Sequence, residues 1–495
     1  MHSDSAVSSP RGIHWWLPRL LVFLIACRFV LLVVAPHYDP SESRYAEISR
    51  KMVETGNWLT PQFDYGVPFW AKPPLSMWMS ALGIQIFGPN EFGSRVFIFL
   101  AAMVVLVLVA KAARREYGEK SGLAAATILM GMPLFFYCSA AVMTDLALVL
   151  GTTLSMVAFR QTLLSPSKCW GYGFFVGLAI GLLAKGPLAL VVAIPPIVGW
   201  VILTGLWRRA WTNVPWISGS FLMLLITVPW YVMAEKRTPG FLDYFIIGEH
   251  WKRFTVKGWK GDLYGSGHPV SPGAIWFFAL ATTLPWCLGL FAVPFRHVRN
   301  LRSWALEGDG RGAYWLLWTL WTLVFFTPAR NVILPYPLPA LPAFAILLAG
   351  ISWQRSNAGS KSGLHPLHPV VLGMSALLTG FVILAVLLLP QASFQGSERN
   401  LVRRFLHDKQ PGDQLAYYDS RRYSAEFYMQ GKLLYAKSEE ELQTELDAPG
   451  RLFVEANPKR FAKLPTDTQK RLKEIANYTK DSSLYLEQTT ASPGK

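Results

Sequence analysis

The sequence of residues 92–112 is FGSRVFIFLAAMVVLVLVAKA, an almost wholly apolar run whose charged side chains stand near its two ends. A helix needs about 20 mostly apolar residues to cross the hydrocarbon core of a bilayer. This run therefore has the length and the composition of one transmembrane helix.

Further apolar runs repeat this pattern along the chain. They cover residues 15–35, 121–138, 143–160, 170–184, 187–205, 214–234, 272–293, 312–328, 332–350 and 369–390. The first is too long, and its flank lacks the small-residue cleavage pattern, for a removable signal peptide. The sequence thus predicts an α-helical polytopic membrane protein of about 11–13 transmembrane helices, eleven of them marked by these runs.

Charge is distributed unevenly between two parts of the chain. Residues 391–495 hold 32 charged residues among 105, whereas residues 1–390 hold 46, or about 12%, against roughly 25% in ordinary soluble domains. We therefore predict a transmembrane domain over residues 1–390 and a small soluble α/β domain over residues 391–495. This composition excludes disorder, fibrous repeats and a disulfide scaffold, and it excludes a soluble globule for the first part.

Lys and Arg in short loops mark the cytoplasmic side of a membrane protein. With eleven spans, the basic residues of the N-terminus and of alternate loops fall on one side: Arg11, Arg19, Lys111, Arg114, Arg115, Lys120, Arg160, Lys168, Arg208, Arg209, Arg296, Arg299, Arg302, Arg355 and Lys361. In a bacterial inner membrane this places the N-terminus in the cytoplasm and residues 391–495 in the periplasm. Much of the net charge of +16 is this topology signal, so it does not indicate a nucleic-acid partner.

Two segments on the predicted periplasmic side, residues 36–91 and 235–271, are too long for simple connectors and are rich in aromatic residues, Pro, Gly and charge. Long structured loops on one face of a rigid scaffold commonly carry function. Within the first segment, the stretch Tyr45–Glu54 is amphipathic. We expect it to form a helix that lies at the membrane surface.

Charged groups in or beside membrane spans are costly, so each needs a partner or a function. Those that the topology places at the outer face come from six separate segments. They are Asp39, Glu42, Arg44, Glu47, Lys72, Asp145, Lys185, Glu249, His250, Arg253, His268 and Arg330, with Tyr336 beside the last. Their concentration on one face predicts a polar cavity at the outer leaflet.

The residue types indicate what this cavity binds. Four cations can hold a phosphate, the arginines as a bidentate fork and the lysines as point charges: Arg44, Lys72, Lys185 and Arg330. Three carboxylates can orient sugar hydroxyls or accept a proton: Asp39, Glu42 and Asp145. A phosphate carried on a lipid and reached from the bilayer fits both sets.

Short motifs in the same segments point to a family. They are PSESRYAEI (40–48), GNWLTP (56–61), AKPPL (71–75), MTD (143–145), GLLAKGP (181–187), EHWKRF (249–254), GHP (267–269) and LPY (334–336). In these motifs the chain resembles polyprenyl-phosphate-sugar glycosyltransferases of the GT-C type. It is most similar to the 4-amino-4-deoxy-L-arabinose lipid A transferases and to bacterial protein-mannosyltransferase-like enzymes.

The resemblance implies a donor sugar on undecaprenyl phosphate and transfer at the periplasmic leaflet to lipid A or another envelope acceptor. It implies that Arg44, Lys72 and Lys185 hold the donor phosphate, and that Asp145 and Tyr336 line the cavity. We add three further candidates for substrate binding because the topology places them at the same face: His250, His268 and Arg330.

Two positions depart from the family pattern. Ser41 stands where members usually have an aspartate, so we expect the catalytic carboxylate to be Glu42, with Asp39 as the alternative. Ala71 stands where the aminoarabinose branch has a glutamate associated with a bound metal, which weakens the case for a divalent cation. We therefore assign no metal ligand and no resident cofactor.

Alternatives stay open at this stage. The acceptor is lipid A or lipopolysaccharide, an O-antigen or core sugar, or a protein hydroxyl. A flippase for lipid-linked sugars would also need a polar cavity, but the sequence shows no internal repeat of the kind that transporters contain. His250 and His268 have a second interpretation as packing or headgroup contacts, since two histidines without a third ligand make a poor metal site.

Overall fold

The computed structural model describes residues 16–265, 268–290, 301–357, 380–381, 396–479 and 482–488. Some features predicted above lie outside these residues: Arg11, Gly267, Arg296, Arg299, Lys361, most of run 369–390 and residues 391–395. The chain divides into two compact units. The helical unit is Met1–Leu32, Asn57–Met79 and Arg95–Val382, and the C-terminal unit is Val33–Gly56, Ser80–Ser94 and Ile383–Lys495.

Helices and two short strands make up the helical unit. Its elements are α1 (Trp16–Val34), β1 (Gln62–Asp64), β2 (Val67–Pro68), α3 (Leu75–Phe87), α4 (Glu91–Tyr117), α5 (Glu119–Met130), α6 (Pro133–Cys138), α7 (Thr144–Leu164), α8 (Lys168–Lys185), α9 (Leu188–Thr204), α10 (Trp207–Asn213), α11 (Trp216–Arg237), α12 (Phe241–Asp243), the π-helix η1 (Tyr244–Lys252), α13 (Arg253–Thr255), α14 (Ala274–Thr283), the 3₁₀ turn η2 (Trp286–Leu290), α16 (Leu301–Phe326), the 3₁₀ turn η3 (Leu338–Ala340) and α17 (Leu341–Asn357). Helices α1, α3 and α4 each continue into or out of the C-terminal unit.

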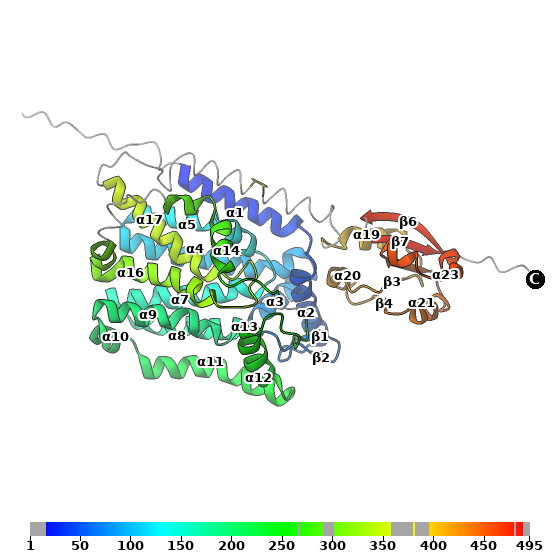
Figure 1. Ribbon diagram of the computed structural model, residues 1–495, viewed down its shortest axis with the longest axis horizontal. Coiled ribbons are helices and arrows are strands. Elements are labelled where there is room, and N and C mark those ends of the chain that lie inside the picture. The colour runs from blue at the N-terminus through cyan, green and yellow to red at the C-terminus, as the bar shows by residue number, and fades with distance from the viewer. Residues whose placement is uncertain are drawn as a thin grey trace, which may run out of the picture. The chain divides into compact units, whose positions relative to one another are not determined.

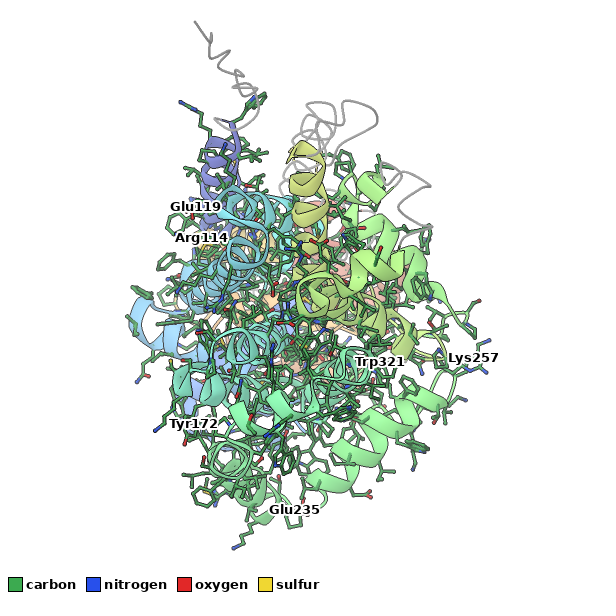
Figure 2. All side chains as sticks on the ribbon, turned by 90° about the vertical axis from the view of Figure 1, so that its left-hand side faces the viewer. Arg114, Glu119, Tyr172, Glu235, Lys257 and Trp321 are labelled. Carbon is green, nitrogen blue, oxygen red and sulfur yellow. The ribbon has the colours of Figure 1, made fainter. Side chains whose placement is uncertain are left out.

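The central helices of this unit pack side by side. Helix α8 lies between α7 and α11, α9 packs on α8 and α16, and α17 packs on α16 and α5 (Figure 1). Close approach of α7 and α8 depends on glycine, because a Cβ atom on Gly151 would lie 2.5 Å from the backbone nitrogen of Gly181. Trp321 of α16, labelled in Figure 2, donates a hydrogen bond from its indole nitrogen to the Val191 carbonyl of α9 at 2.7 Å.

Four of the described helices are long and apolar enough to cross a membrane: α1, α4, α7 and α11. Shorter apolar helices lie at Leu75–Phe87, Leu188–Thr204, Ala274–Thr283 and Leu338–Ile351, and proline interrupts some of the predicted runs. Run 121–138, for example, is split between α5 and α6, where Pro133 occupies the first turn. Exposed apolar side chains on α11, such as Ile217 at 90%, are what a lipid-facing surface requires. The helical fold class is confirmed.

Segment 36–91, expected to be a long structured outer loop, contains the apolar helix α3, which the sequence analysis did not mark. One local prediction was wrong. Arg160 was expected in a cytoplasmic loop, yet it lies within α7 with no exposed surface. Its guanidinium contacts Glu116 at 2.6 Å and donates to the carbonyls of Gly308 and Asp309. A kink in α16 at residues 307–310, in left-handed backbone at 308–310, presents these two carbonyls.

The C-terminal unit contains a mixed sheet with helices. Its elements are α2 (Ser41–Thr55), α19 (Arg399–Asp408), β3 (Gln414–Tyr418), α20 (Tyr423–Tyr428), β4 (Leu434–Ala436), α21 (Glu439–Leu446), β5 (Leu452–Ala456), α22 (Pro458–Phe461), α23 (Thr466–Arg471), β6 (Leu472–Thr479) and β7 (Ser482–Glu487). The strand order is β4-β3-β5-β7-β6, parallel from β4 to β5 and antiparallel beyond it (Figure 1). This confirms the predicted α/β class for the C-terminal region.

Helix α2 confirms the helix predicted over Tyr45–Glu54, but its predicted position at the membrane surface was wrong. Both its apolar face and its polar face are buried, with Ile48 and Lys51 each 1% exposed. Lys51 contacts Glu426 of α20 at 3.3 Å, so the polar face packs against the C-terminal segment. A buried charge needs an opposite partner, and α20 supplies it.

Candidate functional site

In the helical unit, an ion pair joins the first predicted outer loop to the second. Lys72 Nζ lies 2.7 Å from Glu249 Oε2 and also donates to the Ala71 carbonyl at 2.7 Å. The Lys72 side chain is 20% exposed and that of Glu249 is 1% exposed. The Lys72 side chain therefore keeps some exposed surface, whereas the Glu249 side chain is enclosed.

Glu249 is surrounded by donors. Arg253 lies one turn further along at 3.2 Å and also contacts Asp262 at 3.1 Å, and Tyr244 donates its hydroxyl to Glu249 at 3.3 Å. Burial raises the pKa of the Glu249 carboxyl, but Lys72 and Arg253 outweigh it and hold the pKa below its ordinary value. Glu249 is thus a carboxylate that holds the Lys72 ammonium group in place.

A second buried pair joins α7 to α8. Lys185 Nζ, at the end of α8, lies 2.7 Å from Asp145 Oδ1, in the first turn of α7. The same ammonium group lies 5.5 Å from the centre of the Tyr336 ring, within the range of a cation–π interaction. Three residues that sequence analysis grouped at one face therefore lie together.

The π-helix η1 connects the two pairs. His250, directly after Glu249, has its Nδ1 2.7 Å from the Phe245 carbonyl and its Nε2 3.1 Å from the Lys185 carbonyl. Burial lowers the pKa of His250. Gly186 permits this contact: its φ is +65° and a Cβ there would lie 2.5 Å from Phe245 Cζ. One short helix thus contacts Lys72 through one residue and the Lys185 backbone through the next.

Other predicted residues of the helical unit have different surroundings. Arg330 has an exposed side chain, and its backbone N–H donates to Phe254 while its carbonyl accepts from Val270. His268 is also exposed and precedes the bridge between Pro269 and Asn331. They lie on two segments that the bridge between Pro269 and Asn331 joins, and the half-buried His250 connects η1 to the Lys185 backbone.

The predicted acidic and arginine candidates of the first motif lie in the C-terminal unit. Both carboxylate oxygens of Asp39 accept from Ser424, one of them from its N–H at 3.0 Å, and Ser43 donates its hydroxyl as well. Glu42 is 3% exposed and lies 3.7 Å from His37 Nδ1. Arg44 is only partly buried and lies over the rings of Tyr45 and Tyr423.

Sequence reasoning quoted Glu249 and Arg253 in a motif but did not select them as site residues. Asp262 and Tyr244 were missed entirely, and their chain separation from Lys72 left no local signal. Within the described part of the chain, no three His, Cys, Asp or Glu side chains lie close enough to hold a metal ion.

The fold and the paired charged residues are those of a multi-pass membrane protein with a GT-C-type fold. Residues 15–245 match the family described as dolichyl-phosphate-mannose-protein mannosyltransferase. Over 97% of its length the chain superposes on 99% of ArnT from Cupriavidus metallidurans, crystallised with undecaprenyl phosphate, with a TM-score of 0.75 at 18% identity. That likeness establishes the shared fold.

Two sequence relatives carry a more specific name than the family model does. Undecaprenyl phosphate-alpha-4-amino-4-deoxy-L-arabinose arabinosyl transferase 1 of Pseudomonas fluorescens (strain Pf0-1) is 30% identical over 74% of this chain and 63% of its own length. The second enzyme of that name from Sodalis glossinidius (strain morsitans) is 31% identical over 74% of this chain and 64% of its own length. The matched region thus spans just under two thirds of each relative.

Proposed function

We propose that this protein is a glycosyltransferase that moves a sugar from an undecaprenyl-phosphate-linked donor to an envelope acceptor, lipid A or lipopolysaccharide first among them. The observation that carries the proposal is the arrangement around η1, where Lys72 and Lys185 are each held by a buried carboxylate at 2.7 Å. The relatives named for transfer of 4-amino-4-deoxy-L-arabinose from undecaprenyl phosphate support this donor class.

The chemistry assigns a role to each charge. An acceptor oxygen forms a bond to the anomeric carbon of the sugar, and the bond from that carbon to the lipid phosphate breaks. The phosphate leaves with both bonding electrons, so negative charge grows on its oxygens. Fixed cations that face this growing charge lower the barrier without reorganising. We assign this to Lys72 and Lys185, with Arg44 as the third phosphate contact.

In this proposal Asp145 and Glu249 orient these lysines, and Tyr336 supports Lys185 through its ring. The proposal keeps Glu42 as the carboxylate that accepts a proton when the acceptor is a hydroxyl, with Asp39 as the alternative. A phosphate acceptor is already an anion and needs no base. His268 and Arg330 remain proposed contacts to the substrate.

We further propose the bacterial inner membrane as the location, with the N-terminus in the cytoplasm. Transfer then takes place at the periplasmic face, and residues 391–495 form a periplasmic domain. Reversed orientation would place the lysine pairs on the cytoplasmic side, where the positive-inside rule predicts the basic loops.

A direct experiment tests the function. The purified protein in lipid nanodiscs is given undecaprenyl-phosphate-linked 4-amino-4-deoxy-L-arabinose with lipid A, with rough lipopolysaccharide, or with a hydroxyl-bearing peptide, and products are identified by mass spectrometry. Transfer to lipid A is expected. Transfer only to another acceptor would show that lipid A is not the acceptor. Movement of the donor across the bilayer without transfer would show that the protein is a flippase. Lipid A from deletion and wild-type cells gives the matching comparison in vivo.

A further inference from the structure

The helix η1 has π geometry over Tyr244–Lys252. In a π-helix each backbone hydrogen bond joins residues five apart, so side chains five apart lie on the same side of the helix. Tyr244 therefore reaches Glu249, to which it donates its hydroxyl at 3.3 Å. The Phe245 ring likewise meets the His250 ring edge-on, with ring centres 4.6 Å apart. In an α-helix, residues five apart are rotated by about 140°, which would separate both pairs.

His250 lies at the C-terminal end of α8. Its Nε2 is 3.1 Å from the carbonyl oxygen of Lys185, the last residue of that helix. The last carbonyls of a helix have no N–H partner within it, and the helix dipole places partial negative charge there. A positively charged imidazolium is therefore favoured at this position over a neutral ring.

Both nitrogens of the His250 ring face carbonyl oxygens. Nδ1 lies 2.7 Å from the Phe245 carbonyl within η1, and Nε2 faces the Lys185 carbonyl. A carbonyl oxygen only accepts, so each contact is a hydrogen bond only when the nitrogen concerned carries a proton. A neutral imidazole carries one such proton, whereas an imidazolium carries two. The bond that joins η1 to α8 and the bond inside η1 therefore form together only in the protonated ring.

Charges near the ring set the balance between its two forms. The charged groups nearest to it, directly or through an ion pair, are Lys72, Asp145, Lys185, Glu249 and Arg253. Burial and the charge of Lys72 lower the pKa of His250, and the two carbonyls and Glu249 oppose them without reversing the shift. Because Lys72 is close enough to lower this pKa, a phosphate bound at Lys72 would place negative charge beside the ring and favour the imidazolium.

We propose that His250 is a positioning residue of the donor-phosphate site: its imidazolium form fastens η1 to the end of α8 and so holds Lys72 and Lys185 in fixed positions on one phosphate. This inference rests on the proposed function, in which both lysines bind that phosphate. Glu249 holds Lys72 to η1 through its ion pair, and His250 holds the Lys185 backbone to the same helix. Phosphate binding accordingly takes up a proton from solvent at His250 Nε2, and release of the phosphate returns it.

The test uses the full-length protein in nanodiscs and two substitutions that separate the two contacts. The amide nitrogen of His250→Gln reaches about as far as Nε2 and donates to the Lys185 carbonyl at any pH, whereas that of His250→Asn reaches only about as far as Nδ1. Binding of undecaprenyl phosphate is measured by microscale thermophoresis at about pH 5.5 and about pH 8.5, on either side of the range in which histidine titrates. Because the probe also titrates, the proteins are compared with one another at the same pH.

At about pH 5.5, wild type and His250→Gln are expected to bind about 2- to 12-fold more tightly than His250→Asn, the range that one hydrogen bond spans. By about pH 8.5 wild type should lose this advantage, while His250→Gln keeps it. Equal affinities of the two variants, or a wild-type advantage that does not change with pH, would overturn the proposal. His407→Gln is the matched control and should stay near wild type, because the His407 side chain is 84% exposed on α19.

Hydrogen exchange after the end of α8 gives a readout that does not depend on the donor. Without ligand at about pH 5.5, His250→Asn is expected to speed exchange of the Gly186 and Ala189 amides, which are hydrogen-bonded in the structure, relative to His250→Gln. Equal exchange in the two variants would show that His250 does not hold α8. If wild type binds no undecaprenyl phosphate, the proposed function fails by itself, and the exchange measurement still decides whether His250 holds α8.

Discussion

Lys185 and Asp145 form an ion pair 2.7 Å long with side chains 9% and 8% exposed, between two helices that pack along most of their length. Each charge depends on the other because neither is well hydrated. The single substitution Asp145→Asn is expected to cost about 3–5 kcal/mol in the free energy of unfolding. In the double variant Asp145→Leu/Lys185→Met, stability in detergent should largely return while transfer stays absent. A double variant as unstable as the single one would contradict this.

The phosphate contacts give the sharpest test by activity. Lys72→Ala, Lys185→Ala and Arg44→Ala should each reduce transfer by about 30-fold to several thousand-fold, as expected when one partner of a buried charged contact is lost. Arg114→Ala is the matched control, because Arg114 and Glu119 form an exposed pair (Figure 2). If any of the three variants is folded in the membrane and has near-normal turnover, the substituted residue contacts lipid headgroups and not the donor phosphate.

The acid of the first motif is tested by two amide substitutions. Glu42→Gln is expected to lower turnover to a hydroxyl acceptor at least about 100-fold with donor binding retained, the scale of general-base catalysis. Asp39→Asn should cost less than about tenfold, because an amide oxygen still accepts from the Ser424 N–H. Steady-state rates and donor affinities are measured side by side. A larger effect of Asp39→Asn would make Asp39 the catalytic carboxylate. If neither substitution lowers turnover, a phosphate acceptor is favoured.

The buried carboxyl of Glu398 makes the stability of the C-terminal unit depend on pH. Burial, reinforced by the nearby Glu455, raises the pKa of Glu398 from 4.5 to about 8, against the pull of Arg422. The folded state therefore holds a proton that the unfolded state releases above its ordinary pKa, so stability falls as pH rises from about 5 to 8, by up to about 1.4 kcal/mol per unit. Hydrogen exchange in β3 and β5, corrected for intrinsic rates, measures this. Glu398→Gln should flatten the slope.

Membrane orientation is tested with fused reporters. A reporter active only in the periplasm should be active when fused after Leu389 and silent when fused after Arg209. The reverse result would place the lysine pairs on the cytoplasmic side and remove the basis for the proposed transfer.

Sequence predicted the fold class well because a bilayer imposes one strong rule on length and hydropathy. It also grouped Asp145, Lys185 and Tyr336 correctly, because all three stand at span ends on one predicted face. It could not predict that Glu249 pairs with Lys72, since the two are 177 positions apart and nothing local to either residue records the partner.

The same limit explains the mistake over α2. Amphipathic patterning shows that a helix has two unlike faces, but it does not show what covers them. Charged residues on a polar face usually meet water, so the amphipathic stretch Tyr45–Glu54 suggested a membrane surface. Glu426 covers that face instead, and a pairing across 375 positions lies beyond any periodicity argument.

The contacts of Arg160 also bear on how the protein is made. Its carboxylate partner Glu116 precedes it by 44 positions, whereas the carbonyls of Gly308 and Asp309 follow by 148 and 149. At about 5–20 residues per second, a ribosome needs roughly 7–30 s to supply those later partners. We therefore expect the Glu116 carboxylate to pair with the guanidinium of Arg160 during synthesis, before the kink in α16 has been made.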